Sequence, residues 1–310
     1  MRFIDAGAVH AALPFPHLIA TLRQAFATPC QVPLRHTHAV EDRFTSLIMP
    51  AWTARHYGVK VINIAPGNAA LGLPGLHASY LLHDAATGVP LALLDGDAIT
   101  ARRTVAASAL AASYLAREDA QHLLVVGAGR LARLLPTAFA AVRTIRRVTV
   151  WARSAPQATA LAARLREDGF DALAAHDLAT ACASADIVSC ATLATAPVVQ
   201  GAWLAPGSHL DLIGSFSPQM CEADDACFAG AGLWVDTAEA LQKSGDLLGP
   251  LARGVVRAED VRGTLSDLVT GAARGRSSEA ERTVFKAVGT ALEDLAAAVA
   301  VFEAEATRRP

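Results

Sequence analysis

Two glycines stand where an apolar segment ends, at a spacing that can bind phosphate. Residues 123–126 are uniformly apolar, and Gly127 and Gly129 follow them directly, ahead of a segment with helical periodicity. The first glycine permits a tight turn, and the second lets the backbone approach a pyrophosphate at the helix N-terminus. Ala132 occupies the third position of this motif, where alanine is tolerated. The spacing predicts a dinucleotide phosphate site, against the alternative of an ordinary strand-to-helix turn.

A second predicted strand ends on residues that could read the ribose of such a dinucleotide. Residues 148–152 are β-rich and are followed by Arg153 and Ser154. An acidic residue there would bind the 2′-hydroxyl of NAD, whereas an arginine with a hydroxyl neighbour suits a 2′-phosphate. The pair indicates NADPH, with NADH as the less preferred cofactor. The alternative is that both residues form a solvated strand end.

Three cations in the first third of the chain come from separate segments. Lys60 lies in the middle of a β-rich segment, and strand alternation places it on the same face as Gly58 and Ile62. Arg35 and Arg103 lie in two other segments of the same region. Together the three would form an anion pocket. The alternative is three unrelated surface charges.

The elements that would position these residues fall into two groups. Residues 1 to about 112 are predicted to form a helix at 16–27, strands at 45–49, 57–64, 77–83 and 90–94, and a helix at 100–116. Residues from about 118 to 238 alternate between strand and helix, with further strands at 171–174, 185–191, 208–213 and 233–235. This alternation predicts a parallel sheet covered on both faces.

A last helix is predicted from residue 283 to about 307, with one apolar and one acidic face. The acidic face is assigned to Glu293, Asp294, Glu303 and Glu305. Too little chain follows the parallel sheet to form another domain, so this helix is expected to rejoin the N-terminal part. The predicted fold class is α/β, with a Rossmann-type doubly wound parallel sheet at 113–282 and a split α+β domain formed by 1–112 with 283–310.

The composition excludes several classes of protein. The formal net charge is −2 and there is no basic stripe, which argues against a nucleic-acid partner. Hydrophobic residues make up 53% of the chain, but no apolar run reaches the roughly eighteen residues of a membrane span. Five cysteines without metal-binding spacing favour a reduced compartment and no metal site. With no signal-peptide pattern at the N-terminus, the expected location is the cytoplasm.

The chain resembles the ornithine cyclodeaminase/mu-crystallin family in segments that follow the same order along nearly its whole length. They are Ile-Met-Pro at 48–50, Gly-Val-Lys-Val at 58–61, Pro-Gly-Asn at 66–68, Asp84 with Thr87, Gly88 and Pro90, Ile-Thr-Ala-Arg-Arg-Thr-Val-Ala at 99–106, Gly-Ala-Gly at 127–129, and Phe-Lys-Ala-Val-Gly-Thr-Ala-Leu-Glu-Asp at 285–294. The resemblance implies a homodimer formed through the split domain, with substrate held between the domains against the nicotinamide.

The resemblance also assigns roles to individual residues. Lys60 and Arg35 resemble the residues that hold the substrate carboxylate, and Arg103 resembles an arginine that contacts substrate carboxylate or cofactor phosphate. Lys286 has the alternative of only bracing the last helix. The implied cofactor contacts are Arg103, Thr104, Gly127, Ala128, Gly129, Arg130, Leu131, Arg153, Ser154, Thr192, Ser215, Lys286 and Gly289.

Three positions depart from the pattern of the cyclodeaminases. Leu131 replaces a common glutamine, which removes one polar contact to the cofactor. Phe216 stands where cyclodeaminases carry an acid/base aspartate, and Leu47 stands where they carry a glutamate. A phenylalanine cannot relay a proton, so the two lost acids argue against ornithine cyclisation.

The loop that contains Phe216 instead resembles members that reduce cyclic ketimines. The implied reaction is NADPH-dependent reduction of Δ1-pyrroline-2-carboxylate, or Δ1-piperideine-2-carboxylate, to L-proline or L-pipecolate, with Phe216 packed on the substrate ring. Lys60 is the candidate proton donor, and protonation of the imine by solvent is the alternative. An amino-acid dehydrogenase of the L-alanine type, an ornithine cyclodeaminase and a non-catalytic mu-crystallin-like binding protein remain as alternatives.

Overall fold

The chain folds into two compact units in a computed structural model that describes residues 1–307. Unit 1 comprises Met1–Ala106 and the C-terminal segment from Thr290 onward, and unit 2 comprises Ala107–Gly289. The division falls inside the long helix α3 (Gly96–Leu115), which therefore contributes residues to both units.

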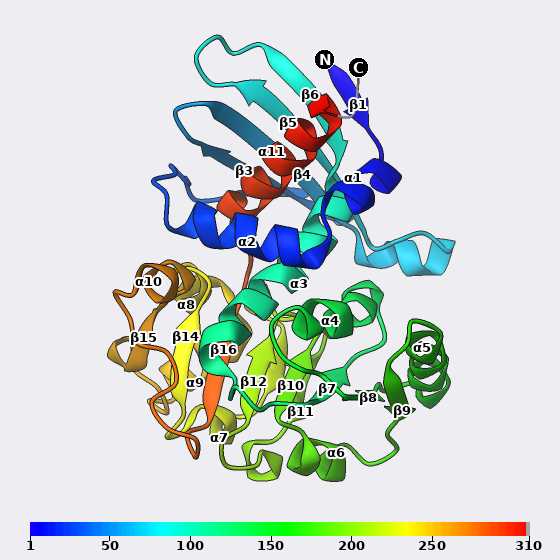
Figure 1. The fold of residues 1–310 in the computed structure, drawn as a ribbon, viewed down its shortest axis with the longest axis vertical. Helices are drawn as coiled ribbons and strands as arrows, with labels where there is room; N and C mark the ends of the chain where they lie inside the picture. Colours follow the sequence, from blue (N-terminus) through cyan, green and yellow to red (C-terminus); the bar gives the residue numbers. More distant parts are fainter. Residues whose placement is uncertain (308–310) are drawn as a thin grey trace. The chain divides into compact units, whose positions relative to one another are not determined.

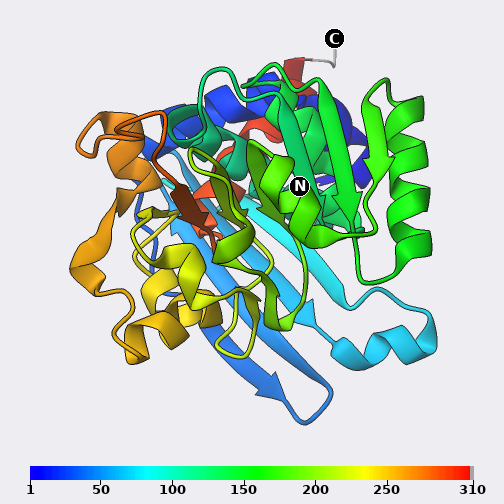
Figure 2. The same cartoon turned by 90° about the horizontal axis from the view of Figure 1, so that it is seen from below.

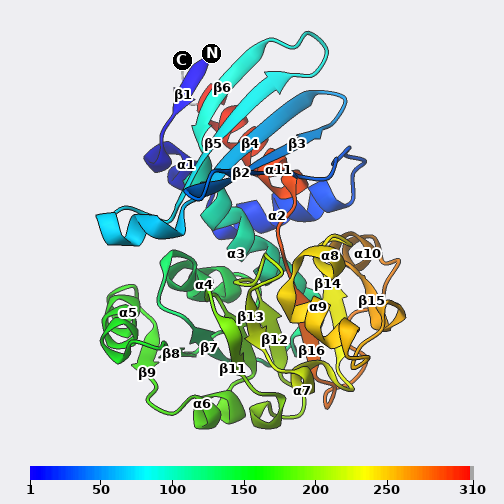
Figure 3. The same ribbon diagram turned by 180° about the vertical axis from the view of Figure 1, so that it is seen from behind.

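Unit 1 is built on a mixed sheet with the strand order β1-β6-β5-β4-β3-β2 (Figure 3). Its strands are β1 (Arg2–Ile4), β2 (His36–Val40), β3 (Phe44–Trp52), β4 (His56–Ile64), β5 (Leu76–Asp84) and β6 (Pro90–Asp95). The strands from β2 to β6 pair antiparallel, and β1 pairs parallel with β6. A short 3-10 helix, Pro66–Leu71, lies between β4 and β5.

One face of the unit 1 sheet is covered by α11 (Ala291–Thr307). This helix contacts β3, β4 and β5 and lies beside α2 (Phe15–Phe26), and the shorter α1 (Ala6–Ala12) also contacts it (Figure 1). Along β4, Gly58, Lys60 and Ile62 are buried, whereas Val61 between them is exposed. Because successive side chains of a strand point to opposite faces, the predicted alternation of β4 directs Lys60 to the covered face.

Unit 2 contains a parallel sheet with the order β15-β14-β16-β12-β10-β7-β8-β9. Its strands are β7 (His122–Val126), β8 (Arg147–Trp151), β9 (Asp171–Ala174), β10 (Ile187–Cys190), β12 (His209–Leu212), β14 (Gly232–Val235), β15 (Val261–Thr264) and β16 (Thr283–Lys286). A separate small sheet pairs β11 (Thr195–Val199) with β13 (Cys221–Ala223). The order of the first five strands, β9-β8-β7-β10-β12, confirms the predicted Rossmann-type doubly wound sheet.

Strand β7 is apolar after its first residue because helices cover both faces of the sheet, whereas the neighbouring strands also carry buried polar residues such as Ser189, Asp211 and Lys286. Leu123–Val126 have no exposed surface, and α5 lies along β8 and β9 (Figure 2). The helices of this unit, besides its share of α3, are α4 (Arg130–Ala140), α5 (Ala155–Glu167), α6 (Leu178–Ser184), α7 (Asp225–Phe228), α8 (Ala240–Lys243), α9 (Gly245–Ala252) and α10 (Leu265–Thr270). Short 3-10 turns occur at Gly201–Trp203 and Ala258–Asp260.

The prediction of a helix beginning at residue 283 is wrong. Residues Thr283–Lys286 form β16, a fully buried strand inserted between β12 and β14, and α11 begins only at Ala291. A strand buried on both faces has no polar alternation, so its period is easily read as that of an apolar helix. Gly289 adopts a left-handed conformation, with φ of 79°, and separates the strand from the helix.

Within residues 1–307, the helices are all too short or too polar to cross a membrane.

Candidate functional site

Lys60 is fully buried in unit 1 and is paired with a carboxylate. Its side chain is 1% exposed, and Nζ lies 2.7 Å from Oδ2 of Asp294 on α11. Tyr80 on β5 lies directly opposite Lys60 in the strand register and is also buried. The ammonium group has three N–H donors, so the contact with Asp294 leaves it with capacity to bind a second anion.

Arg103 on α3 binds two side chains in the first turn of α11. Its Nε donates to Oδ1 of Asp294 at 2.8 Å, and its Nη1 donates to Oε2 of Glu293 at 2.6 Å. Both carboxylates are fully buried, and both lie at the N-terminus of α11, where the helix dipole favours negative charge. Lys60, Arg103, Glu293 and Asp294 thus form a four-residue cluster within unit 1, hereafter the buried charge cluster.

The buried charge cluster is balanced between two cations and two anions. Burial lowers the pKa of Lys60 from 10.5 to about 8; Asp294 opposes this shift, and the charges of Arg103 and Arg35 add to it. Burial raises the pKa of Asp294, but the charges of Arg103 and Lys60 outweigh it and hold the pKa below its usual value. Arg35 is half-buried, and its charge adds to that of Arg103 at Lys60, which suits a ligand that carries a carboxylate.

The glycine turn of unit 2 has the geometry that a dinucleotide phosphate requires. Gly127 has a φ of 125°, and a Cβ there would lie 2.7 Å from the carbonyl oxygen of Ala191. Gly129 is the N-cap of α4, and among residues 1–307 no side chain caps this end and no heavy atom lies within 4 Å of the position a Cβ would take. A helix N-terminus without a side-chain cap and with open space before it fits a pyrophosphate. Ala128, Arg130 and Leu131 stand in the same turn and are at least partly exposed.

Arg153 and Ser154 follow β8, the strand beside β7. Arg153 is exposed, and Ser154 is the N-cap of α5. In a doubly wound sheet the residues after this strand face the adenosine ribose. The placement fits the predicted contact with a 2′-phosphate.

Glu222 on β13 connects the loops after β10 and β12. Its Oε1 accepts hydrogen bonds from the backbone N–H and the hydroxyl of Thr192, at 2.7 and 2.8 Å. Its Oε2 accepts hydrogen bonds from the backbone N–H groups of Gly214 and Ser215, at 2.7 and 3.2 Å. Burial raises the pKa of Glu222 to about 7, although the charge of Lys286 lowers it. The predicted cofactor contacts Thr192 and Ser215 are therefore held by one carboxylate.

Lys286 and Gly289 lie in buried hydrogen-bond networks of unit 2. Lys286 has no exposed surface, and its Nζ donates to Oδ2 of Asp246 at 3.0 Å. Asp246 in turn accepts from the backbone N–H of Glu222 at 2.6 Å. The backbone N–H of Gly289 donates to Oδ2 of Asp236 at 2.6 Å. These contacts give Lys286 a bracing role, and its predicted contact with the nicotinamide stays a prediction.

The two remaining predicted residues also have contacts of their own. Phe216 is half-buried and packs against the hydrophobic core of unit 2. The hydroxyl of Thr104 on α3 donates to the carbonyl oxygen of Thr100 at 2.8 Å. Their roles toward substrate and cofactor stay predictions.

The acidic partners of the predicted site were not expected from the sequence. Glu293 and Asp294 were assigned to an acidic face of the last helix opposite its apolar face, but both side chains are fully buried, on the side that packs against the unit 1 sheet and α3. The spacing of residues along the last helix could have revealed the burial of Asp294. One face of this helix, all of it buried, is formed by Asp294, Ala297, Ala298 and Val301. A carboxylate on that face needs a buried cation, and Lys60 and Arg103 supply it.

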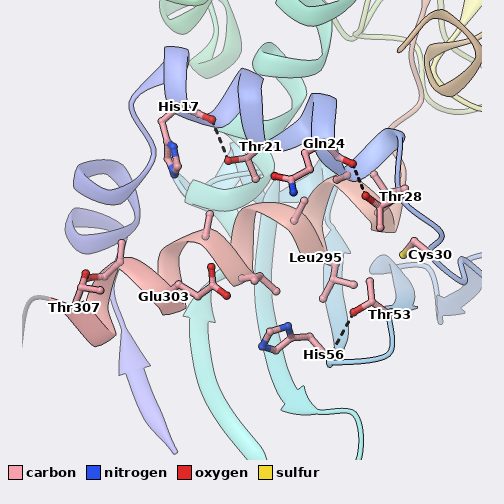
Figure 4. A pocket seen from close by; sticks show the side chains of 16 residues that line it. His17, Thr21, Gln24, Thr28, Cys30, Thr53, His56, Leu295, Glu303 and Thr307 are labelled. Carbon is pink, nitrogen blue, oxygen red and sulfur yellow. Dashed lines mark hydrogen bonds between the residues drawn. The ribbon is translucent and has the colours of Figure 1, made fainter. Parts of the chain in front are cut away.

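Unit 1 also contains a cavity of about 590 Å³ between α2 and α11 (Figure 4). His17, Thr21 and Gln24 of α2 line one side, and His56 after the β3–β4 turn lines another. Apolar side chains of α11 line the rest of the cavity, and they are Leu292, Leu295, Ala296, Val299 and Ala300. The predicted site residues do not line this cavity. The part of the chain that the structure describes also holds no cluster of three or more His, Cys, Asp or Glu side chains placed to bind a metal ion.

We predict that Asp294→Asn destabilises the protein by roughly 3–5 kcal/mol, because it leaves two buried cations with one counterion. Urea unfolding followed by circular dichroism measures the change. Glu167→Gln on α5 is the control, since Glu167 is exposed and lies away from both the cluster and the cavity, and a surface substitution shifts stability by less than about 0.5 kcal/mol. Equal effects of the two substitutions would contradict the structural importance of the buried charge cluster.

Comparisons with known proteins agree with this geometry. A Δ1-pyrroline-2-carboxylate reductase of Paracoccus denitrificans is 43% identical over 297 residues, which cover 95% of this chain and 94% of the relative. The Thermococcus litoralis Δ1-pyrroline-2-carboxylate reductase, solved with NADH and L-proline, superposes with a TM-score of 0.96 at 32% identity, over 99% of this chain and 98% of that one. An archaeal alanine dehydrogenase, solved as a dimer with bound NAD, superposes with a TM-score of 0.94 at 28% identity, over 99% and 97% of the two chains. The sequence model of one family matches residues 11–308, and the chain belongs to that family, the ornithine cyclodeaminase/mu-crystallin family.

Proposed function

We propose that the protein reduces cyclic ketimines that carry one carboxylate, chiefly Δ1-pyrroline-2-carboxylate, to the corresponding cyclic amino acid with a reduced nicotinamide dinucleotide. The observation that carries the proposal is the similarity along the whole chain to a reductase that holds NADH and L-proline, the product of this reaction. The positive charges of Arg35 and Arg103 close to the ammonium of Lys60 support it, because together they would attract a substrate carboxylate. Half-buried Phe216, where a cyclodeaminase would need an acid, favours reduction over deamination.

The residues of unit 1 bind and orient the substrate. Lys60 and Arg35, with Arg103, hold the carboxylate, and fixing one end of a flat ring restricts where the imine carbon lies. When bound, the reduced nicotinamide supplies the hydride. The pKa of Lys60, about 8, leaves its ammonium mostly protonated at neutral pH. Lys60 is therefore also suited to donate a proton to the imine nitrogen, with protonation by solvent as the alternative.

The residues of unit 2 bind the dinucleotide, and we propose NADPH as the preferred form. Gly127, Ala128 and Gly129 with the start of α4 hold the pyrophosphate, and Arg153 with Ser154 holds the 2′-phosphate. Arg130 and Leu131 border the pyrophosphate. Thr192, Ser215, Lys286 and Gly289 belong to the loops and strand ends on the nicotinamide side. NADH is the less preferred cofactor because it lacks the charge that Arg153 would bind.

We propose that unit 1, which corresponds to the predicted split domain of 1–112 with 283–310 except that residues 107–112 and 283–289 belong to unit 2, binds substrate and forms the dimer. Unit 2, predicted as 113–282, is proposed to bind NADP(H). We also propose that the protein is cytoplasmic. The described cysteines are all unpaired, as is usual in a reducing compartment.

One second function has a specific observation in its favour. The archaeal alanine dehydrogenase superposes nearly as well as the reductase. An enzyme of that type would use the same dinucleotide residues with an acyclic keto acid and ammonia. Pyruvate with ammonia therefore belongs in the activity test.

We expect purified protein to oxidise NADPH rapidly with Δ1-pyrroline-2-carboxylate and to form L-proline. Absorbance at the reduced nicotinamide band measures the rate, with pyruvate plus ammonia and ornithine as controls. Lys60→Ala should abolish turnover but retain NADPH binding, because Lys60 lies in unit 1 and the residues proposed to bind the pyrophosphate and the 2′-phosphate lie in unit 2. If the protein does not consume NADPH with the cyclic imine, the reductase function is refuted. If Lys60→Ala retains turnover, the role of Lys60 is refuted.

Arg153→Ala should weaken NADPH selectively over NADH, because it removes the cation that faces the 2′-phosphate. A charge-assisted hydrogen bond of about 1.5–3 kcal/mol corresponds to a loss of roughly tenfold or more in NADPH affinity. Titration of both cofactors by nicotinamide fluorescence measures the ratio. Arg147→Ala on the same strand is the matched control, since Arg147 is exposed at the opposite end of β8. An unchanged preference in Arg153→Ala would exclude Arg153 as the selecting residue.

We propose that a second copy of the chain covers the cavity between α2 and α11 and forms a homodimer. The face of α11 that lines the cavity carries the partly exposed apolar side chains Leu292, Ala296, Val299 and Ala300 beside the exposed Glu303. A largely apolar surface of this kind marks an interaction site. The similarity to an alanine dehydrogenase solved as a dimer favours a second copy as its occupant. Ala300→Arg should convert the dimer to a monomer in size-exclusion chromatography with light scattering. Ala160→Arg, on the exposed face of α5, should remain dimeric, and an unchanged mass for Ala300→Arg would place the interface elsewhere.

A further inference from the structure

Glu222 holds the backbone of two neighbouring loops in one arrangement. Each carboxylate oxygen serves a different loop: Oε1 binds Thr192, after β10, and Oε2 binds Gly214 and Ser215, after β12. The side chain is fully buried, so water does not compete for these four hydrogen bonds. A buried carboxylate that accepts bonds from backbone N–H groups fixes their positions more firmly than a neutral acceptor does.

The two loops pack so closely that only one arrangement fits. A Cβ on Gly214 would overlap the carbonyl oxygen of Thr192 and the carboxylate of Glu222. Glu222 is itself fixed from behind, because Asp246 accepts its backbone N–H and is paired with Lys286. A chain of buried contacts thus runs from β16 through α9 to the two loops.

The strand order places these loops on one side of the dinucleotide turn. Gly127 follows β7; β8, with Arg153, lies on one side of β7, and β10 and then β12 lie on the other. In a doubly wound sheet the two halves of a dinucleotide bind on opposite sides of this central strand. The Arg153 side takes the adenosine, so the loops after β10 and β12 belong to the nicotinamide half.

We infer that Glu222 is a positioning residue for the nicotinamide half of the cofactor, acting through the backbone of Thr192 and of Gly214–Ser215. The inference rests on the proposed dinucleotide function. Glu222 itself is not proposed to touch the cofactor. It fixes the backbone of the loops that are proposed to touch it, and Asp246 and Lys286 hold Glu222 in place.

The test compares a whole dinucleotide with its adenine half. Isothermal titration calorimetry would measure NADPH and adenosine 2′,5′-bisphosphate against the full-length protein and Glu222→Gln. The amide turns an N–H₂ group toward one of the two loops, so at least one pair of hydrogen bonds is lost. We expect NADPH affinity to fall about tenfold or more, with adenine-half affinity unchanged within about twofold. Glu259→Gln, exposed in the same unit, is the matched control and should leave both affinities unchanged.

Each other outcome has a distinct meaning. Equal loss of both ligands would show a general structural role, and unchanged NADPH binding would show no role; either result overturns the inference. Failure of the unaltered protein to bind either ligand would instead overturn the proposed function, and the inference with it. If Glu222→Gln does not fold, Thr192→Val removes one of the four bonds and should give a smaller loss with the same selectivity for NADPH. Equal loss of both ligands in Thr192→Val would again overturn the inference.

Discussion

The buried charge cluster of unit 1 constrains the fold around it. Lys60 and Arg103 are removed from water, and an isolated buried charge costs several kcal/mol even after relaxation. Glu293 and Asp294 make their burial tolerable, so the N-terminal turn of α11 has to lie over β4 and beside α3. Residues more than 190 positions apart are thereby joined, which is why the C-terminal helix completes a domain that begins at the N-terminus.

Because its charge must be paired inside the protein, Lys60 can be both a structural and a functional residue. A lysine held only for stability could be replaced by an apolar side chain of similar volume, often without loss. Here burial and two neighbouring arginines lower its pKa to about 8, while Asp294 keeps the charged form favourable. The ammonium is thus strongly desolvated, positioned by one partner and still able to donate to another. Those are the properties that a carboxylate clamp needs.

The sequence predicted the elements whose patterns are local. The parallel strands β7 to β10, β12 and β14, the glycine turn and the antiparallel strands β3 to β6 follow from apolar runs, alternation and turn residues. The sequence did not predict α1 or the strands β1, β2, β11, β13 and β15, which are short or largely exposed. Strand β16 was mistaken for helix because a doubly buried strand lacks alternation. The domain boundary expected near residue 112 lies after Ala106, within the helix that the two units share. The boundary expected near residue 283 lies before Thr290, because the strand that begins at residue 283 was mistaken for helix.

The predicted site residues have a feature in common that their spacing alone does not reveal. Motif spacing and resemblance pointed to the cations and glycines, which would touch ligands. Their carboxylate partners, Asp294, Glu222, Asp246 and Asp236, are remote in sequence and hydrogen-bond mainly to cations or backbone N–H groups. Apart from Asp294, which shares a helical face with buried apolar residues, these acids have no local signature, because the role of each depends on which donors the fold brings to it. In both units, buried acids therefore hold residues that are expected to bind ligands. The position of those residues depends on contacts between segments that are distant in the sequence.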